Sequence, residues 1–197
     1  MSLEIILALA AFALATSITP GPNNLMLMTS GANFGFLRTI PHMLGISLGH
    51  MFMMVILGIG LSQVFETYSA AQLILQVLSV LYMLYLAWRM ANAASLSASQ
   101  KKGRPLNFFE AAAFQWVNPK AWAMALTAIS VYAADTRFLS ILVVAALFSS
   151  INFPSVCVWT LLGTQLRRWL TTDRRLRRFN ITMAVLLVAS LWPVLRG

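Results

Sequence analysis

Charged and catalytic groups are scarce in this chain. Of its 197 residues, 10% are charged and five are acidic, whereas about a quarter of the residues in ordinary soluble domains are charged. The single cysteine, Cys157, excludes a disulfide within the chain, and with only two histidines no metal-binding cluster can be drawn. There is no G-x-S-x-G elbow, H-E-x-x-H motif, P-loop or glycine-rich nucleotide fingerprint. The sequence therefore predicts neither an enzyme nor an ATP-hydrolysing protein, and it implies no cofactor and no metal.

Apolar residues dominate instead, at 59% of the chain. The net charge of +9 could indicate a nucleic-acid partner. However, the basic residues cluster at the ends of long apolar runs, as they do in the cytoplasmic loops of membrane proteins. The basic run from Arg167 to Arg178 is expected to contact anionic lipid headgroups. We therefore predict an all-α membrane protein surrounded by lipid, with no nucleic-acid partner.

Six apolar segments each approach the roughly 20 residues that cross a bilayer. They run from about residue 3 to 30, 41 to 62, 72 to 90, 110 to 132, 138 to 166 and 180 to 195. The only plausible linker is the polar stretch at about 92–107. It divides a single transmembrane domain, residues 1–197, into half-repeats at about 1–91 and 108–197.

The distribution of Lys and Arg predicts the orientation of these segments. With six spans, two of the basic residues fall on one side, Lys120 lies within a span, and eleven fall on the other side. The pair is Arg137 and Arg196, and the eleven are Arg38, Arg89, Lys101, Lys102, Arg104, Arg167, Arg168, Arg174, Arg175, Arg177 and Arg178. Because positively charged loops remain in the cytoplasm, both termini are predicted to lie on the opposite side of the membrane.

Proline interrupts the first and the fourth segments, at Pro20-Gly-Pro22 and at Asn118-Pro-Lys120. Proline cannot continue a regular helix, and in lipid the freed backbone groups must face protein or a wet cavity. Each break opens one three-span half, and three is odd, so the second half enters the membrane in the opposite sense. This pattern is typical of inverted-repeat transporters. We predict two inverted three-helix repeats whose first and fourth helices are broken.

The first break is a candidate site for a carboxylate. A half-helix that begins after Pro22 presents free N–H groups and a partial positive charge, and Asn23 and Asn24 add side-chain amides. Transporters of amino acids hold a substrate carboxylate at such a helix end. The alternative is a proline kink that only shapes packing.

Three ionisable residues could contact the cargo or couple transport to protons. Lys120 is the only Lys or Arg well inside a predicted span, where a cation is expensive and by default functional; the alternative is snorkelling towards an interface. His50 lies mid-span and titrates in a range that suits proton handling, although a lone histidine can simply be hydrogen-bonded in a bundle core. Glu110, at the start of the fourth segment, is the acid nearest to a span interior.

Two further motifs concern packing. Asn152-Phe-Pro154 is expected to interrupt the fifth segment and to join the cavity wall. Gly45-Ile-Ser-Leu-Gly49 is a G-x-x-x-G motif, which pairs helices either within one chain or between two chains. It is therefore compatible with a homodimer.

These motifs together resemble the LysE/RhtB superfamily of amino-acid exporters. The resemblance rests on Thr19-Pro-Gly-Pro-Asn-Asn24, Gly31…Gly35-Phe36, Gly45…Gly49, Tyr82…Tyr85-Leu-Ala-Trp88 and Asn118-Pro-Lys120, and it covers essentially the whole chain. Ser155-Val-Cys-Val-Trp159…Gly163 is further similar to the cysteine and O-acetylserine exporter branch.

The resemblance implies a multi-pass protein of the bacterial inner membrane, with periplasmic termini, that exports amino acids or close derivatives on the proton gradient. It implies that the substrate path is lined by Pro20, Gly21, Pro22, Asn23, Asn24, Asn118, Pro119 and Lys120. Because mid-span acids are lacking, small neutral cargo such as cysteine, O-acetylserine, homoserine or threonine is favoured over lysine or arginine. The alternatives are an exporter of basic amino acids and a channel-like or scaffolding protein in which the kinks are structural.

Overall fold

Helices account for almost all of the described chain. The computed structural model describes residues 1–61, 69–93 and 103–192. They contain no strand and form α1 (Leu3–Ile18), α2 (Pro22–Phe34), α3 (Phe36–Ile56), the π-helical turn η1 (Leu57–Leu61), α5 (Ser69–Ala91), α6 (Phe108–Val117), α7 (Pro119–Tyr132), α8 (Phe138–Leu166) and α9 (Asp173–Ala189). The predicted all-α class is confirmed. Most of the expected linker at 92–107 falls on residues 94–102, which lie outside the described residues, as do Lys101, Lys102 and Arg196.

Several of these helices are long and apolar enough to cross a membrane. Among the described residues they are Phe36–Gly60, Leu73–Ala91 and Phe138–Leu166, and α1 and α2 make a fourth if they count as one span bent by 57°. The helices α6, α7 and α9 have 10, 14 and 17 residues, each short of the roughly 20 that span a bilayer. A count of six spans therefore stays a prediction.

The helix bounds agree with the sequence at one segment and depart from it at another. The helix α8 covers Phe138–Leu166, as predicted. The helix α9 begins at Asp173 rather than at about 180, so the prediction was wrong there. The apolar run starts late, but Thr172 caps the helix by accepting a hydrogen bond from the Arg175 N–H at 3.3 Å. The first turns of α9 are thus helical although they are strongly basic.

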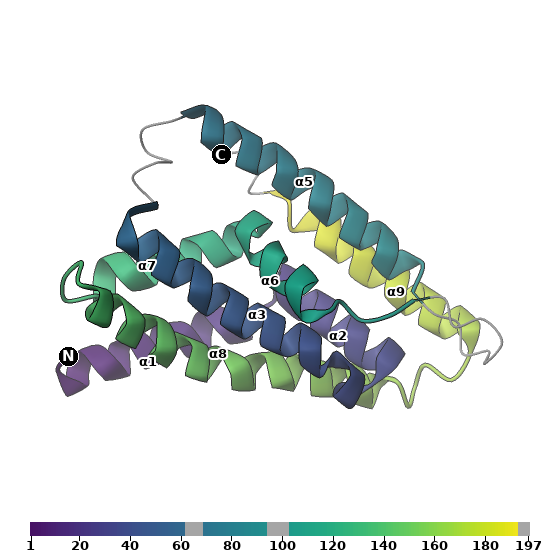
Figure 1. The fold of residues 1–197 in the computed structure, drawn as a ribbon. Coiled ribbons are helices and arrows are strands. Elements are labelled where there is room, and N and C mark those ends of the chain that lie inside the picture. Colours follow the sequence, from purple (N-terminus) through teal and green to yellow (C-terminus); the bar gives the residue numbers. More distant parts are fainter. Residues whose placement is uncertain (62–68, 94–102, 193–197) are drawn as a thin grey trace.

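Several helix ends gather at two opposite ends of the molecule (Figure 1). The α2–α3 turn, the C-terminal end of α5 and the α8–α9 connection share one end, and the start of α1 and the α7–α8 connection share the other. We call the first of these the basic end. It carries Arg38, Arg89, Arg104, Arg167, Arg168, Arg174, Arg175, Arg177 and Arg178, whereas Arg137 lies at the opposite end. Among the described residues, Arg137 is thus separated in space from the basic residues that the sequence places on the other side.

Apolar side chains form two buried clusters and also cover much of the outer surface. One cluster includes Leu25 and Phe114, and the other includes Ala13 and Ala121. Both broken helices therefore pass from one cluster to the other at their break. On the outside of α5, Leu73 is 61% exposed. Such apolar exposure over a whole helix face is expected of a surface that meets lipid.

Glycines bring two pairs of helices into backbone contact. A Cβ on Gly31 of α2 would overlap the Thr160 carbonyl oxygen of α8, and one on Gly163 of α8 would overlap the Met28 carbonyl oxygen of α2. The G-x-x-x-G motif does the same for α3 and α6, because a Cβ on Gly49 would lie 2.5 Å from the Cα of Ala112. That motif therefore packs within one chain and no longer supports a homodimer, which stays a prediction.

Candidate functional site

The first proline break separates α1 from α2. The helix α1 ends at Ile18, Gly21 precedes α2 in an extended conformation, and Pro22 is the first residue of α2. In the part of the chain that the structure describes, no side chain caps the N-terminus of α2, so this helix end presents its N–H groups and the positive end of its dipole to the break. The expected interruption of the first segment is confirmed.

The second break separates α6 from α7 at a single residue. Asn118 ends α6 and begins α7, and its side-chain oxygen accepts a hydrogen bond from the Lys120 N–H at 3.2 Å. Pro119 is the first residue of α7, a position where its missing N–H costs nothing. The expected interruption of the fourth segment is also confirmed, but this helix end is capped.

Lys120 joins the two breaks. Its Nζ donates hydrogen bonds to the Thr19 carbonyl at 2.8 Å, the Thr19 hydroxyl at 2.9 Å and the Pro20 carbonyl at 3.3 Å. The approach is close enough that a Cβ on Gly21 would lie 2.8 Å from the Lys120 Cδ. The carbonyls that the proline break frees are thus satisfied by a cation from the other half of the chain. The ion pairs among the described residues do not include Lys120.

Two asparagines of α2 also make polar contacts at the break. Asn23 exchanges two hydrogen bonds with Gln115 of α6, at 2.8 and 3.2 Å. The buried Asn24 side chain donates to the carbonyls of Ser17 and Thr19, at 2.8 and 2.7 Å. Asn24 and Lys120 thus satisfy carbonyls at the end of α1, and backbone at membrane depth requires such partners.

A third polar contact comes from α8. Asn152 donates to the Ser17 hydroxyl at 3.0 Å and accepts from the Ser47 hydroxyl of α3 at 2.8 Å. Asn152 therefore lies on the cavity wall, as the sequence predicted. The expected interruption at Pro154 was wrong, because α8 continues through this residue; proline is tolerated in membrane helices where neighbouring groups compensate for the lost hydrogen bond.

A small cavity lies where these groups meet. Its wall is made by Gly21, Asn23, Asn24, Asn118, Lys120, Asn152 and four further residues, Thr16, Ser17, Met124 and Val156. Its volume of about 20 Å³ has room for about one water molecule. Five of the eight predicted path residues thus share one cavity, while Pro20, Pro22 and Pro119 shape the backbone around it. An amino acid would enter only if the two breaks moved apart.

The two other ionisable candidates lie apart from this cavity. His50 is buried beside the Phe148 ring, and its Nε2 lies 3.1 Å from the carbonyl oxygen of Ala121, the residue after Lys120. Glu110 lies in the first turn of α6 at the basic end, where it pairs with Arg89 and Arg104. Proton coupling by His50, Glu110 or Lys120 stays a prediction.

Gln115 and Thr19 contribute to the site but were not predicted to do so. Gln115 is fully buried, and Thr19 supplies two of the three acceptors of Lys120. Their signal in the sequence is weak, since each is one polar residue next to a break. A search for polar residues within one helical turn of each proline would have found both.

Comparisons with known proteins identify the family of this chain. The family described as LysE type translocator matches residues 14–190. The cysteine/O-acetylserine efflux protein of Escherichia coli (strain K12) is 31% identical over 192 residues, which cover 95% of this chain and 96% of that protein. The protein of the same name from Shigella flexneri is 32% identical over 181 residues, or 90% of each chain. No solved structure matches.

Proposed function

Because this chain belongs to the LysE type translocator family, we propose that it is a secondary exporter of small neutral amino acids or their close derivatives. It acts in the bacterial inner membrane, with both termini in the periplasm. The observation that carries the proposal is the meeting of two broken helices, one from each half of the chain, around Lys120. Broken helices that face each other across a repeat interface are the usual setting of a transporter's substrate site.

The chemistry of the break favours a carboxylate. The uncapped end of α2 and the Lys120 ammonium offer a partial and a full positive charge beside the amides of Asn23 and Asn24. In the closed arrangement Lys120 binds backbone carbonyls, and in the open one it exchanges them for the cargo carboxylate. The cargo therefore replaces a hydrogen-bond acceptor that the cation already has, which lowers the cost of opening.

The packing supports two inverted repeats. The helix α1 of the first half packs on α8 of the second, and α6 of the second packs on α3 of the first. The helices α5 and α9, each the last of its half, pack on each other. An exchange of partners of this kind is what a two-fold relation between the halves would produce, although α2 packs on α8 much more extensively than its counterpart α7 packs on α3.

The cargo class follows from charge. Among the described residues the break cavity contains no acid that could pair with a cationic side chain, so lysine and arginine are disfavoured. The relatives are named for efflux of cysteine and O-acetylserine. We therefore place these two first and homoserine and threonine next.

Counterflow in proteoliposomes tests the function. Vesicles loaded with an unlabelled amino acid should accumulate the same labelled amino acid, saturably, for cysteine or O-acetylserine and not for lysine. Proton coupling predicts that an imposed pH gradient drives uptake and that a proton ionophore abolishes this uptake. Flux that never saturates would identify a channel, and the absence of flux for every amino acid in the panel would refute the proposal.

A further inference from the structure

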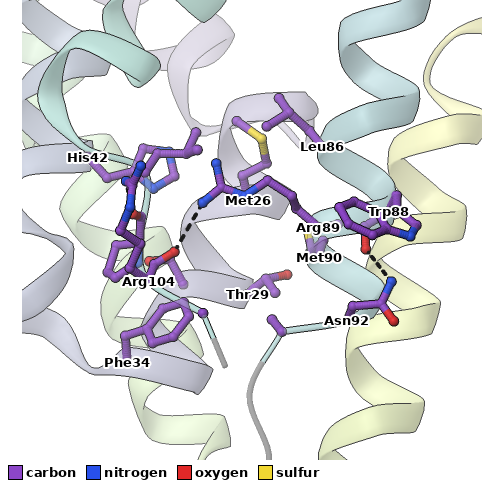
Figure 2. A pocket seen from close by; sticks show the side chains of 15 residues that line it. Met26, Thr29, Phe34, His42, Leu86, Trp88, Arg89, Met90, Asn92 and Arg104 are labelled. Atoms are coloured by element: carbon purple, nitrogen blue, oxygen red, sulfur yellow. Dashed lines mark hydrogen bonds between the residues drawn. The ribbon is translucent and has the colours of Figure 1, made fainter. Parts of the chain in front are cut away.

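A second and larger cavity lies at the basic end. It has a volume of about 310 Å³ and lies between α2, α3, α5 and the segment 103–106 that precedes α6 (Figure 2). We call it the basic-end cavity. Its wall includes the apolar side chains of Met26 and Leu86 and the polar side chains of His42, Arg89 and Arg104. Cavities of roughly 300 Å³ and more with mixed walls are typical of small-molecule sites.

His42 of α3 is an unsatisfied polar group in the wall of this cavity. Its side chain is 1% exposed, and within the described part of the chain neither ring nitrogen has a hydrogen-bond partner. The other histidine, His50, has the Ala121 carbonyl within hydrogen-bond distance of one of its nitrogens. A buried polar group without a partner is costly, and in native proteins it calls for an explanation. A ligand in the cavity would supply the missing partner if the His42 ring turned to bring one of its covered nitrogens to the cavity wall.

Two guanidinium groups share one carboxylate beside His42. Arg104 forms two hydrogen bonds with Glu110, at 2.6 and 2.8 Å, and Arg89 contacts the same carboxylate at 3.3 Å. Hydrogen bonding to Glu110 also raises the pKa of Arg104 above its usual value, so this arginine stays charged. Two cations against one anion leave a net positive charge at the cavity wall, which favours a second carboxylate.

The two cavities lie along one helix. Asn23 and Asn24 of the break lie in the first turn of α2, whereas Met26, Thr29 and Ser30 of the basic-end cavity follow within the next two turns. Six residues of helix, from Asn24 to Ser30, span roughly 9 Å. The two cavities are therefore separated by about two turns of α2.

From these observations we infer that the basic-end cavity is the loading site of the exporter. It binds the cargo amino acid from the cytoplasm, with the cargo carboxylate on Arg89 and Arg104 and a polar group of the cargo on His42. This inference rests on the proposed function. It adds a second cargo site, about two helical turns from the break, to which none of the predicted path residues belongs.

Two variants of the full-length protein test the site. Arg104→Gln removes a cation that is half exposed in its ion pair, so it should cost little stability. His42→Phe keeps a ring of similar size and loses no hydrogen bond within the described chain, so thermal unfolding should be unchanged or shifted upwards. Arg137→Gln, at the opposite end, and Arg174→Gln, an exposed residue at the basic end, are the matched controls.

Equilibrium binding of radiolabelled L-cysteine, kept reduced, to purified protein in detergent is the main measurement. Each of the two variants should weaken binding roughly 10- to 100-fold, as expected for a lost charge-assisted or buried hydrogen bond, and neither control should change it. Cysteamine, which lacks the carboxylate, should fail to compete, whereas mercaptopropionate, which keeps it, should compete.

The outcomes separate this inference from the proposed function. Wild-type counterflow with unaltered binding in both variants would overturn the loading site and leave the exporter intact. Binding that the variants weaken, in a wild-type protein without counterflow, would keep the site and refute the exporter. Absence of both binding and counterflow would refute both, and competition by cysteamine would overturn the assignment of the carboxylate to the arginines.

Discussion

Lys120→Met is the sharpest test of the break as a cargo site. Methionine matches the apolar stem of lysine up to Cε, with a sulfur in place of Cδ, and removes the ammonium. The wild-type ammonium donates three hydrogen bonds to Thr19 and Pro20. The substitution therefore removes both the hydrogen bonds that join the two breaks and the full positive charge that would bind a cargo carboxylate.

The two losses differ in size. Hydrogen bonds to a charged group contribute about 1.5–3 kcal/mol each, but this site is only partly buried, and methionine avoids the cost of desolvating an ammonium. We therefore expect a net loss of about 1 kcal/mol in the free energy of unfolding. Removing one partner of a buried charge pair costs about 2–5 kcal/mol, and the lower end of this range applies to a partly buried site. At about 1.4 kcal/mol per tenfold change, transport should fall about 30-fold.

Counterflow of L-cysteine and thermal unfolding in detergent, measured on the same preparations, separate the two effects. Arg137→Met is the control, since it removes a cation at the opposite end of the molecule. Lys120→Arg should recover part of the transport, because it keeps the charge. If Lys120→Met unfolds somewhat earlier but transports within about threefold of the wild type, Lys120 only holds the breaks together and the carboxylate site is wrong.

Three further predictions follow from the packing and the charges. Gly31→Ala should push α2 off the α8 backbone and destabilise the protein by about 1–3 kcal/mol or more. In Gly58→Ala the new Cβ meets the Ile141 side chain instead of backbone, so this variant should lose less stability. Equal losses in thermal unfolding would refute the difference. Asn23→Leu and Gln115→Leu should each abolish transport without loss of membrane insertion. Because the two amides bond to each other, the double variant should lose about 1 kcal/mol less stability than the sum of the single losses. Simple additivity of the losses would contradict the pairing. In a Cys157→Ser background, Arg137→Cys should react with a membrane-impermeant thiol reagent added to whole spheroplasts and Arg178→Cys should not; the reverse pattern would invert the predicted orientation.

The sequence predicted the parts of the fold that depend on local chemistry. Proline located both helix breaks, and the long apolar run 138–166 located α8. The start of α9 was missed because the prediction followed apolarity, whereas Thr172 and Asp173 begin a helix in a basic segment. Pro154 was given too much weight, since a proline can remain inside a helix that its neighbours hold in place.

Of the two cavities, the sequence predicted one and missed the other. The break cavity was predicted because its residues lie next to prolines in two short motifs. The basic-end cavity was missed, because His42, Arg89 and Arg104 come from three separate stretches of the chain and none belongs to a motif. Their convergence depends on how α2, α3 and α5 pack, which no local pattern encodes.

The glycine contacts hold α2 against α8 and α3 against α6, and we expect each pair to stay packed when the site opens. Backbone meets backbone between α2 and α8 and again between α3 and α6, so neither pair can separate without leaving a void. The pairs share the apolar cluster that includes Leu25 and Phe114, and their polar contacts at the site include side-chain hydrogen bonds, Asn23 with Gln115 and Ser47 with Asn152, which water or a cargo molecule can replace one at a time. Opening and closing should therefore exchange the hydrogen bonds of these amides and hydroxyls. The pairs α2–α8 and α3–α6 should stay packed while they shift relative to each other.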